Sequence, residues 1–133
     1  MAILKPYILS SAAREQGVFY TEALGGEAVS VLTHGEVMGA QSEMKDKIMH
    51  MCIRVAGDNY IFLADAMAPT SGGSNLVLSV EFAAVEEARS AFANLAEGGR
   101  VTFPLELQPF GMYIGQLTDK YGIGWMITTE QKA

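Results

Sequence analysis

Three side chains capable of chemistry share one predicted face of a strand in the middle of the chain. Residues 48–55 alternate in polarity, which places His50, Cys52 and Arg54 on one face and apolar residues on the other. An imidazole titrates near neutral pH, so His50 could serve as a general acid or base at a cavity. The alternative is a hydrogen-bonded histidine on a sheet face or at a dimer interface.

Cys52 and Asp65 are further candidates for chemistry. Cys52 could be a nucleophile only if a cation such as Arg54 activated its thiol, and its alternative role is to fill a small space in the core. Asp65 ends a predicted strand at residues 60–65, where its carboxylate could contact a ligand, act as a base, or simply cap the next turn. His50 and Asp65 are therefore the candidate catalytic residues.

Aromatic residues on predicted strands form a second group of candidates. Tyr7, Tyr113 and Trp125 present flat rings that could form the walls of a ligand cavity. Trp125 is the only tryptophan, and packing in the core is its equally weighted alternative. With the polar face described above, the predicted ligand-binding residues are Tyr7, His50, Arg54, Tyr113 and Trp125.

The elements that would position these residues occur twice along the chain. Residues at helical spacing predict one amphipathic helix before the pair Gly25-Gly26 and a second before Gly98-Gly99. The apolar face of the first helix consists of Ala13, Gly17, Tyr20 and Leu24. That of the second consists of Val85, Ala88, Phe92 and Leu95. We expect strands at residues 2–10, 27–34, 48–55, 60–65, 75–82, 101–107, 112–117 and 125–127, with a loop at 35–47. Each half therefore has the order βαβββ.

This repeat predicts an α+β fold in one domain spanning residues 1–133. The modules are residues 1–66 and 75–131, joined by a Pro-, Gly- and Ser-rich linker at 67–74. Two half-sheets that cannot each bury both faces should pack together, with the helices outside and the sheet curved around a cavity.

Composition excludes several classes of partner. The net charge is −6 and the Lys and Arg residues form no cluster, so we expect no binding to nucleic acid. No apolar run approaches the roughly 20 residues needed to span a bilayer, and no signal peptide is evident, so we expect no membrane association. One cysteine fits a reducing compartment, and we predict a cytoplasmic protein.

Several local motifs resemble one protein family across nearly the whole chain. They are FYTEALGG at residues 19–26, LADAM at 63–67, VEEA at 85–88, LAEGG at 95–99 and TDKYGIGWMI at 118–127. These resemble the PhnB-like branch of the vicinal oxygen chelate superfamily, which includes glyoxalase I, bleomycin-resistance proteins and extradiol dioxygenases. The resemblance implies a homodimer. The branch is also called "3-demethylubiquinone-9 3-methyltransferase"-like, but no glycine-rich loop follows a first Rossmann strand to hold a methyl donor, and we expect no cofactor.

The resemblance also raises the question of a metal. In metal-dependent members of the superfamily, His and Glu side chains from the first and last strands of each module bind one divalent ion. Of the corresponding segments here, those at 3–10 and 75–80 contain no His, Asp or Glu, and the last falls on or beside Trp125. Asp65 is the one candidate, and His34 and His50 have no ligand partners at suitable spacing, so we predict no metal.

These observations lead to one function and two alternatives. The favoured hypothesis is a metal-free protein of the glyoxalase/bleomycin-resistance fold that binds a small molecule against aromatic walls. A glyoxalase-like lyase or isomerase using His50 or Asp65 as its base is the second. A dimer with a purely structural role is the third.

Overall fold

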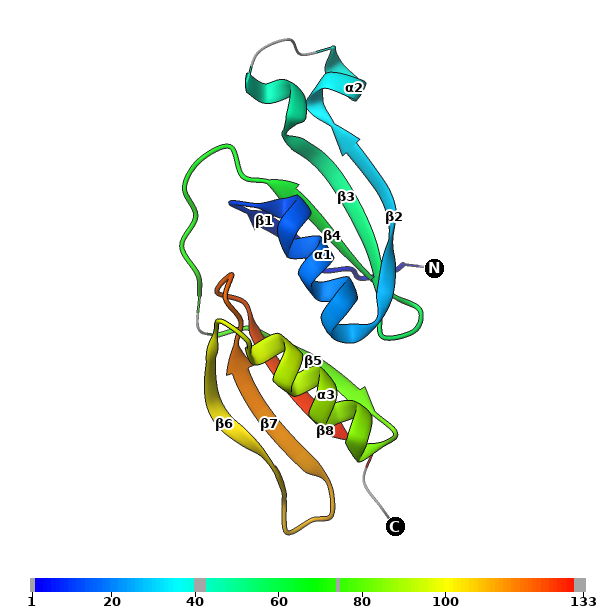
Figure 1. The fold of residues 1–133 in the computed structure, drawn as a ribbon, viewed down its shortest axis with the longest axis vertical. Coiled ribbons are helices and arrows are strands. Elements are labelled where there is room, and N and C mark those ends of the chain that lie inside the picture. The colour runs from blue at the N-terminus through cyan, green and yellow to red at the C-terminus, as the bar shows by residue number, and fades with distance from the viewer. Residues whose placement is uncertain (1, 40–42, 74, 131–133) are drawn as a thin grey trace. The chain divides into compact units, whose positions relative to one another are not determined.

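The computed structural model describes residues 2–39, 43–73 and 75–130. The chain divides into two compact units, Met1–Thr70 and Ser71–Ala133, and each holds one four-stranded sheet (Figure 1). The boundary between the units falls within the linker predicted at 67–74. Residue 74 of that linker and residue 131, the predicted end of the second module, lie outside the described residues.

The first unit is a βαβββ module with two short helical insertions. Its elements are β1 (Tyr7–Ser10), α1 (Ala13–Leu24), β2 (Gly26–Thr33), α2 (His34–Met38), the 3₁₀ helix η1 (Glu43–Asp46), β3 (Ile48–Val55) and β4 (Asn59–Asp65). The strand order is β1-β4-β3-β2, in which β1 and β4 are parallel and the other pairs are antiparallel. The connection through α1 takes the chain from one edge of the sheet to the other.

The second unit repeats this topology without the insertions. Its elements are β5 (Val77–Phe82), α3 (Val85–Ala96), β6 (Arg100–Leu107), β7 (Tyr113–Thr118) and β8 (Gly124–Thr129). The order β5-β8-β7-β6, with β5 and β8 parallel, matches that of the first unit strand for strand. Together the two units confirm the predicted α+β fold of two βαβββ modules.

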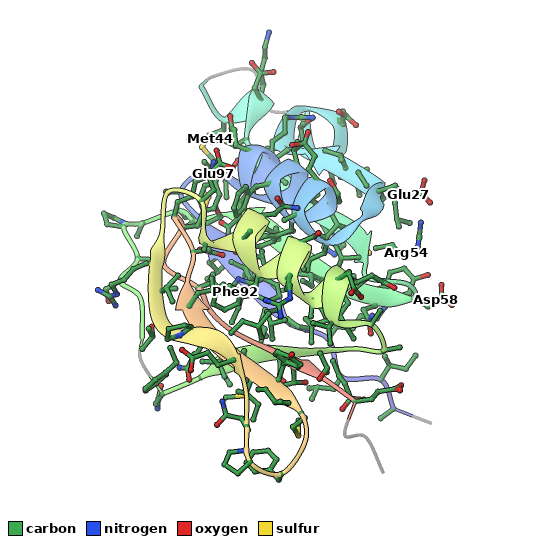
Figure 2. All side chains as sticks on the ribbon, turned by 60° about the horizontal axis from the view of Figure 1, so that its bottom comes forward. Glu27, Met44, Arg54, Asp58, Phe92 and Glu97 are labelled. Carbon is green, nitrogen blue, oxygen red and sulfur yellow. The ribbon has the colours of Figure 1, made fainter. Side chains whose placement is uncertain are left out.

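Each sheet has one face covered by its long helix (Figure 1). In the first unit, Gly17 of α1 lies against the side chains of Met51 and Ile53 on β3. In the second unit the fit is reversed, because Phe92 of α3 lies against Gly115 on β7; Figure 2 labels Phe92 among the side chains of α3. A small residue on one partner therefore admits a large residue on the other, and the core of each unit forms between helix and sheet.

The Gly-Gly pairs have the same geometry in both units. Gly25 is the C-cap of α1, and Gly98 directly follows Glu97, the C-cap of α3. Their φ angles are 75° and 77°, a left-handed region that glycine enters without a steric cost. A Cβ on Gly26 would collide with the carbonyl oxygen of Arg54, and a Cβ on Gly99 would collide with that of Thr118. Both pairs thus let the second strand begin directly against the backbone of its neighbour.

Two expectations about the first unit were wrong. The segment at 35–47, predicted as a loop, contains all of η1 and all of α2 except its first residue, and residues 40–42 of that segment lie outside the described residues. The sequence does carry a signal for α2, namely Thr33 and Glu36 at the spacing of a capping box, followed by Gly39. In the structure the hydroxyl of Thr33 accepts a hydrogen bond from the N–H of Glu36 (3.1 Å), and Gly39 ends the helix in the left-handed region. The first strand is also shorter than residues 2–10, since only Tyr7–Ser10 is paired with β4.

Within the part of the chain that the structure describes, no helix has the combined length and apolar character required to cross a membrane.

Candidate functional site

The candidate site lies on the helix-free face of the first sheet, the face opposite α1. Because α1 packs on Met51 and Ile53, strand alternation directs His50, Cys52 and Arg54 to the other face. The grouping of these three residues on one face, predicted from the polarity of residues 48–55, is therefore confirmed.

Parallel pairing of β1 with β4 brings an aromatic group to this face. Tyr7 is directly opposite Phe62, and Phe62 is opposite Cys52 on β3. The rings of Tyr7, His50 and Phe62, which we call the aromatic cluster, are in mutual contact. Their centroid separations are 4.8 Å for His50 and Phe62, 6.2 Å for Tyr7 and Phe62, and 6.2 Å for Tyr7 and His50. Aromatic pairs favour such tilted and edge-to-face geometries over a face-to-face sandwich.

The aromatic cluster remains accessible to a ligand. Tyr7 is 51% exposed as a residue, and His50 and Phe62 are half-buried. Within the described residues the imidazole of His50 makes ring contacts and no hydrogen bond. Its nitrogens are therefore available to a bound molecule, either to donate and accept hydrogen bonds or to move a proton.

Lys5 adds a positive charge beside the aromatic cluster. Its ammonium lies 4.7 Å from the ring centroid of Phe62 and 5.4 Å from that of Tyr60, within the range of a cation–π interaction. Neither Lys5, Tyr60 nor Phe62 was among the predicted site residues. Alternation along residues 60–65 places Tyr60 and Phe62 on one face of β4, but the approach of Lys5 depends on the parallel pairing of β1.

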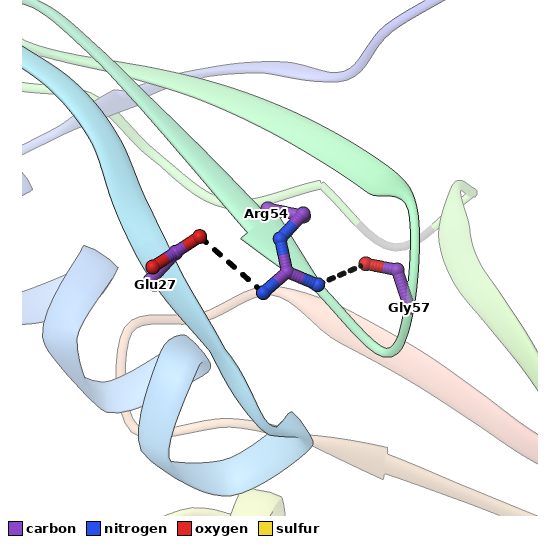
Figure 3. A network of polar contacts seen from close by, with 3 residues as sticks. All are labelled: Glu27, Arg54 and Gly57. Atoms are coloured by element: carbon purple, nitrogen blue, oxygen red, sulfur yellow. Dashed lines mark hydrogen bonds and ion pairs between the residues drawn. The ribbon is translucent and has the colours of Figure 1, made fainter.

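Arg54 lies on the same face and is held by two acceptors (Figure 3). Its Nη1 donates to the carbonyl oxygen of Gly57 at 2.7 Å, and its Nη2 lies 3.5 Å from Oε1 of Glu27 on β2. Arg54 is directly opposite Tyr60 on β4 and Glu27 on β2. Its guanidinium is therefore fixed at the hairpin end of the sheet and partly neutralised by Glu27.

Cys52 is a free, buried cysteine beneath this face, opposite Phe62 in the sheet. Arg54 directs both of its described contacts to Gly57 and Glu27, and none is made to the thiol. This position favours the interpretation of Cys52 as a packing residue rather than a nucleophile.

Asp65 has a structural position on the other face of the sheet. Its Oδ1 accepts a hydrogen bond from the N–H of Ala13 at the start of α1 (2.9 Å), and its Oδ2 accepts from the N–H of Ile48 at the start of β3 (2.7 Å). The carboxylate thus caps a helix in place of the capping side chain that Ala12 lacks. These contacts favour a structural role over that of a base, but the backbone that Asp65 binds is at the starts of α1 and β3 and not in the turn after β4.

Trp125 and Tyr113 lie on the helix-covered face of the second sheet. Trp125 is opposite Leu117 and only 1% exposed, and its indole N–H donates to Oδ2 of Asp119 (2.8 Å). Asp119 also accepts from the N–H groups of Tyr121 (2.8 Å) and Ile123 (3.1 Å), so this one carboxylate shapes the turn before β8. For Trp125 the structure therefore favours core packing, one of its two predicted roles.

Tyr113 shares the side of the second sheet on which α3 packs. Its ring lies 5.3 Å from the guanidinium carbon of Arg89, a residue of α3. The backbone N–H of Tyr113 donates to the hydroxyl of Thr129 at 3.0 Å. Of the five residues predicted to bind ligand, the structure thus brings Tyr7 and His50 into contact and places Arg54 on the same face, whereas Tyr113 and Trp125 belong to the other module.

The donor set does not fit the metal site of the superfamily. Alternation places Tyr7 and Leu9 of β1, and Phe62 and Ala64 of β4, on the helix-free face of the first sheet. The same positions of the second sheet are Ser79 and Glu81 on β5, and Met126 and Thr128 on β8, so Glu81 is the one carboxylate among them. Within the described ranges no three His, Cys, Asp or Glu side chains form a group able to hold a metal ion. Both Asp65 and Trp125 lie one residue out of phase with these positions.

An open depression of about 280 Å³ lies elsewhere in the first unit. It is lined by Ser11, Ala66, Met67, Ala68, Pro69 and Thr70. None of these side chains titrates near neutral pH, so the depression offers no acid–base chemistry.

Comparison with known proteins identifies the family. The model of the Glyoxalase/Bleomycin resistance protein/Dioxygenase superfamily matches residues 18–127. The chain belongs to this superfamily. Two other proteins are similar to this chain over nearly their full length. Protein YjdN from Escherichia coli (strain K12) is 26% identical over 137 residues, covering 93% of this chain and 92% of YjdN. The crystal structure of protein PA1353 from Pseudomonas aeruginosa is 30% identical, with a TM-score of 0.86 and coverage of 99% of this chain and 100% of PA1353.

The resemblance to the PhnB-like branch of the glyoxalase superfamily also has a structural counterpart. The PhnB protein from Bacillus cereus shares the fold with a TM-score of 0.79 at 24% identity, covering 97% of this chain and 100% of that one. The motifs at residues 63–67 and 118–127 contain Asp65 and Asp119, the two carboxylates that bind backbone N–H groups in the two modules. In this chain, both motifs therefore contain a carboxylate that accepts hydrogen bonds from the backbone of its module.

Proposed function

We propose that this chain is a small-molecule-binding protein that holds its ligand against the aromatic cluster without a metal. The observation that carries the proposal is the contact of Tyr7, His50 and Phe62 on a sheet face that α1 leaves uncovered. Aromatic side chains with a small number of polar groups beside them are the usual lining of small-molecule sites. The donor set described above supports binding through ring contacts rather than through a divalent ion.

Thermal-shift screening of a compound library tests this proposal. A ligand that binds only the folded state stabilises that state by RT ln(1 + [L]/Kd), so the melting temperature rises with the logarithm of ligand concentration once the concentration exceeds Kd. We expect Tyr7→Ala and His50→Ala each to weaken binding, so that each variant needs at least about fivefold more ligand than the wild type to reach the same shift. Phe103→Ala is the matched control, because Phe103 is an exposed ring on β6 of the other module. An equal shift in all four proteins would place the ligand elsewhere and contradict the proposal.

A second function is an enzyme of lyase or isomerase type that uses His50 as its acid–base group. It is favoured by the available nitrogens of His50 on an accessible face, whereas both oxygens of Asp65 are engaged. His50→Gln would then abolish turnover of a ligand found by the screen while its binding survives. Unchanged turnover in this variant would leave His50 as a binding residue only.

The assembly and location proposed for the chain are a homodimer in the cytoplasm. The family resemblance supports the dimer, and the single cysteine supports a reducing compartment. Light scattering of the purified protein distinguishes a dimer from a monomer. A structural dimer without ligand function, the remaining alternative, would give a dimer mass and no thermal shift with any compound.

A further inference from the structure

The charges around the aromatic cluster define the kind of ligand that the helix-free face accepts. The groups there that carry or can carry a positive charge are Lys5, His50 and Arg54, and the carboxylate opposite Arg54 is that of Glu27. Glu27 forms its ion pair with Arg54. Within the described residues Lys5 makes no ion pair. The face is therefore locally positive in a chain whose net charge is −6.

The position of Lys5 disfavours a cationic ligand. Aromatic rings attract cations through their negative faces, but the Lys5 ammonium already lies over Phe62 and Tyr60. A second cation on these rings would be repelled by the first at short range, whereas an anion would be attracted. The N–H groups of Lys5 that do not face the rings remain able to donate hydrogen bonds to such an anion.

We propose that the ligand is an anion built on a planar aromatic group. Its ring packs on the exposed part of Tyr7 and on Phe62, and its carboxylate or other anionic group is bound by the Lys5 ammonium. His50 contacts the same rings and offers a nitrogen to a second polar group of the ligand. This inference rests on the proposed function, since it names the class of ligand for the same site.

Three probes with one ring system and different charges test the inference. They are 2-naphthoate, 2-naphthalenemethanol and 2-naphthylmethylammonium, titrated by calorimetry into the full-length protein at low ionic strength. We expect the anion to bind up to about fivefold more tightly than the neutral and cationic probes, the largest difference that one exposed charge pair usually gives. The preference should weaken as salt is added, because salt screens exposed charges.

Variants of Lys5 locate the source of the preference. Lys5→Gln should lower the affinity for 2-naphthoate about fivefold and leave that for 2-naphthalenemethanol nearly unchanged. Lys5→Arg should restore the preference for the anion. Lys120→Gln is the matched control, because the Lys120 ammonium lies 5.6 Å from the ring centroid of Tyr121 in the other module, and this variant should bind all three probes as the wild type does.

The outcomes separate this inference from the proposed function. If the probes bind, Tyr7→Ala weakens them, and Lys5→Gln has no more effect than Lys120→Gln, the site stands and the anionic ligand class is wrong. Equal binding of the three probes by the wild type has the same meaning. If none of the probes binds, or if Tyr7→Ala leaves binding unchanged, both the site and the ligand class are overturned.

Discussion

The two modules share a backbone plan and differ in what their helix-free faces carry. Strand order, the parallel pair and the Gly-Gly geometry are the same in both. Across the middle of the first sheet, the helix-free face carries Tyr7, Phe62 and Cys52 on β1, β4 and β3; the equivalent residues of the second sheet are Ser79, Met126 and Gln116. The aromatic cluster therefore belongs to one copy of the repeat.

This difference shows how a repeated fold separates stability from binding. The residues that the copies share by position, such as the glycine pairs, face a helix or a neighbouring backbone. Side chains of the helix-free face are less constrained by packing, because many of them are exposed or half-buried. One copy can consequently carry ligand chemistry while the other keeps the same architecture with different side chains.

The largest loss of stability is expected for Trp125→Ala. A small loss would contradict the assignment of this side of the second module to stability. Trp125 fills the helix-covered side of the second module, so its loss should lower the free energy of unfolding by about 3–5 kcal/mol. Trp125→Phe should cost about 1.5–3 kcal/mol, because Asp119 loses the indole donor. Urea unfolding followed by circular dichroism measures both. Phe103→Ala, at an exposed site (60%), should stay within about 0.5 kcal/mol.

The last residues of the fourth strands test whether the modules are equivalent. Asp65 accepts from backbone N–H groups of both α1 and β3, whereas Thr129 accepts from the first residue of β7. Asp65→Ala should cost about 1–3 kcal/mol, since two donors lose their acceptor. Thr129→Val should cost about 1 kcal/mol. Urea unfolding of the two variants measures both losses. A larger loss for Thr129→Val than for Asp65→Ala would contradict the expected order.

The smallest effect is expected at the ion pair of the first module. Glu27 is 68% and Arg54 31% exposed in their side chains, at a separation of 3.5 Å. Exposed pairs contribute little, so Glu27→Gln should change the free energy of unfolding by less than about 0.5 kcal/mol. The same urea measurement applies. A loss above about 1 kcal/mol would give this surface pair a structural role and weaken the division between the two faces.

Local periodicity predicted the faces of the elements well. The alternation at residues 48–55 placed His50 and Arg54 correctly opposite α1, and the helical spacing placed Ala13, Gly17, Tyr20 and Leu24 on the buried side of α1. These patterns succeed because each element is buried on one side only, so its sequence records which side that is.

Contacts between distant segments could not be predicted in the same way. Tyr7 meets Phe62 because β1 pairs in parallel with β4, 55 residues later, and no local pattern specifies that partner or its register. The same pairing delivers Asp65 to the start of α1 and Lys5 to the ring of Phe62. Tyr7, His50 and Arg54 were therefore predicted as single residues, whereas the contacts that join Tyr7 to Phe62 and bring Lys5 beside them were not.

The sequence also could not predict which residues of the last strand, β8, face the helix. Both faces of β8 contain apolar residues, since Trp125 and Ile127 alternate with Met126, and alternation in polarity gives no phase there. The deciding contact is the hydrogen bond from Trp125 to Asp119, six residues earlier across a turn. That bond depends on the turn between the two residues, which Asp119 also holds through the N–H groups of Tyr121 and Ile123.

The buried position of the single tryptophan gives the chain a built-in optical probe of one module. Its indole is shielded from water and hydrogen-bonded within the second unit, and the first unit contains no tryptophan. Emission excited at the indole band reports the environment of the second unit, whereas circular dichroism reports the helices and strands of both. Superposition of the two unfolding curves would therefore reveal whether the halves of the repeat melt as one cooperative body.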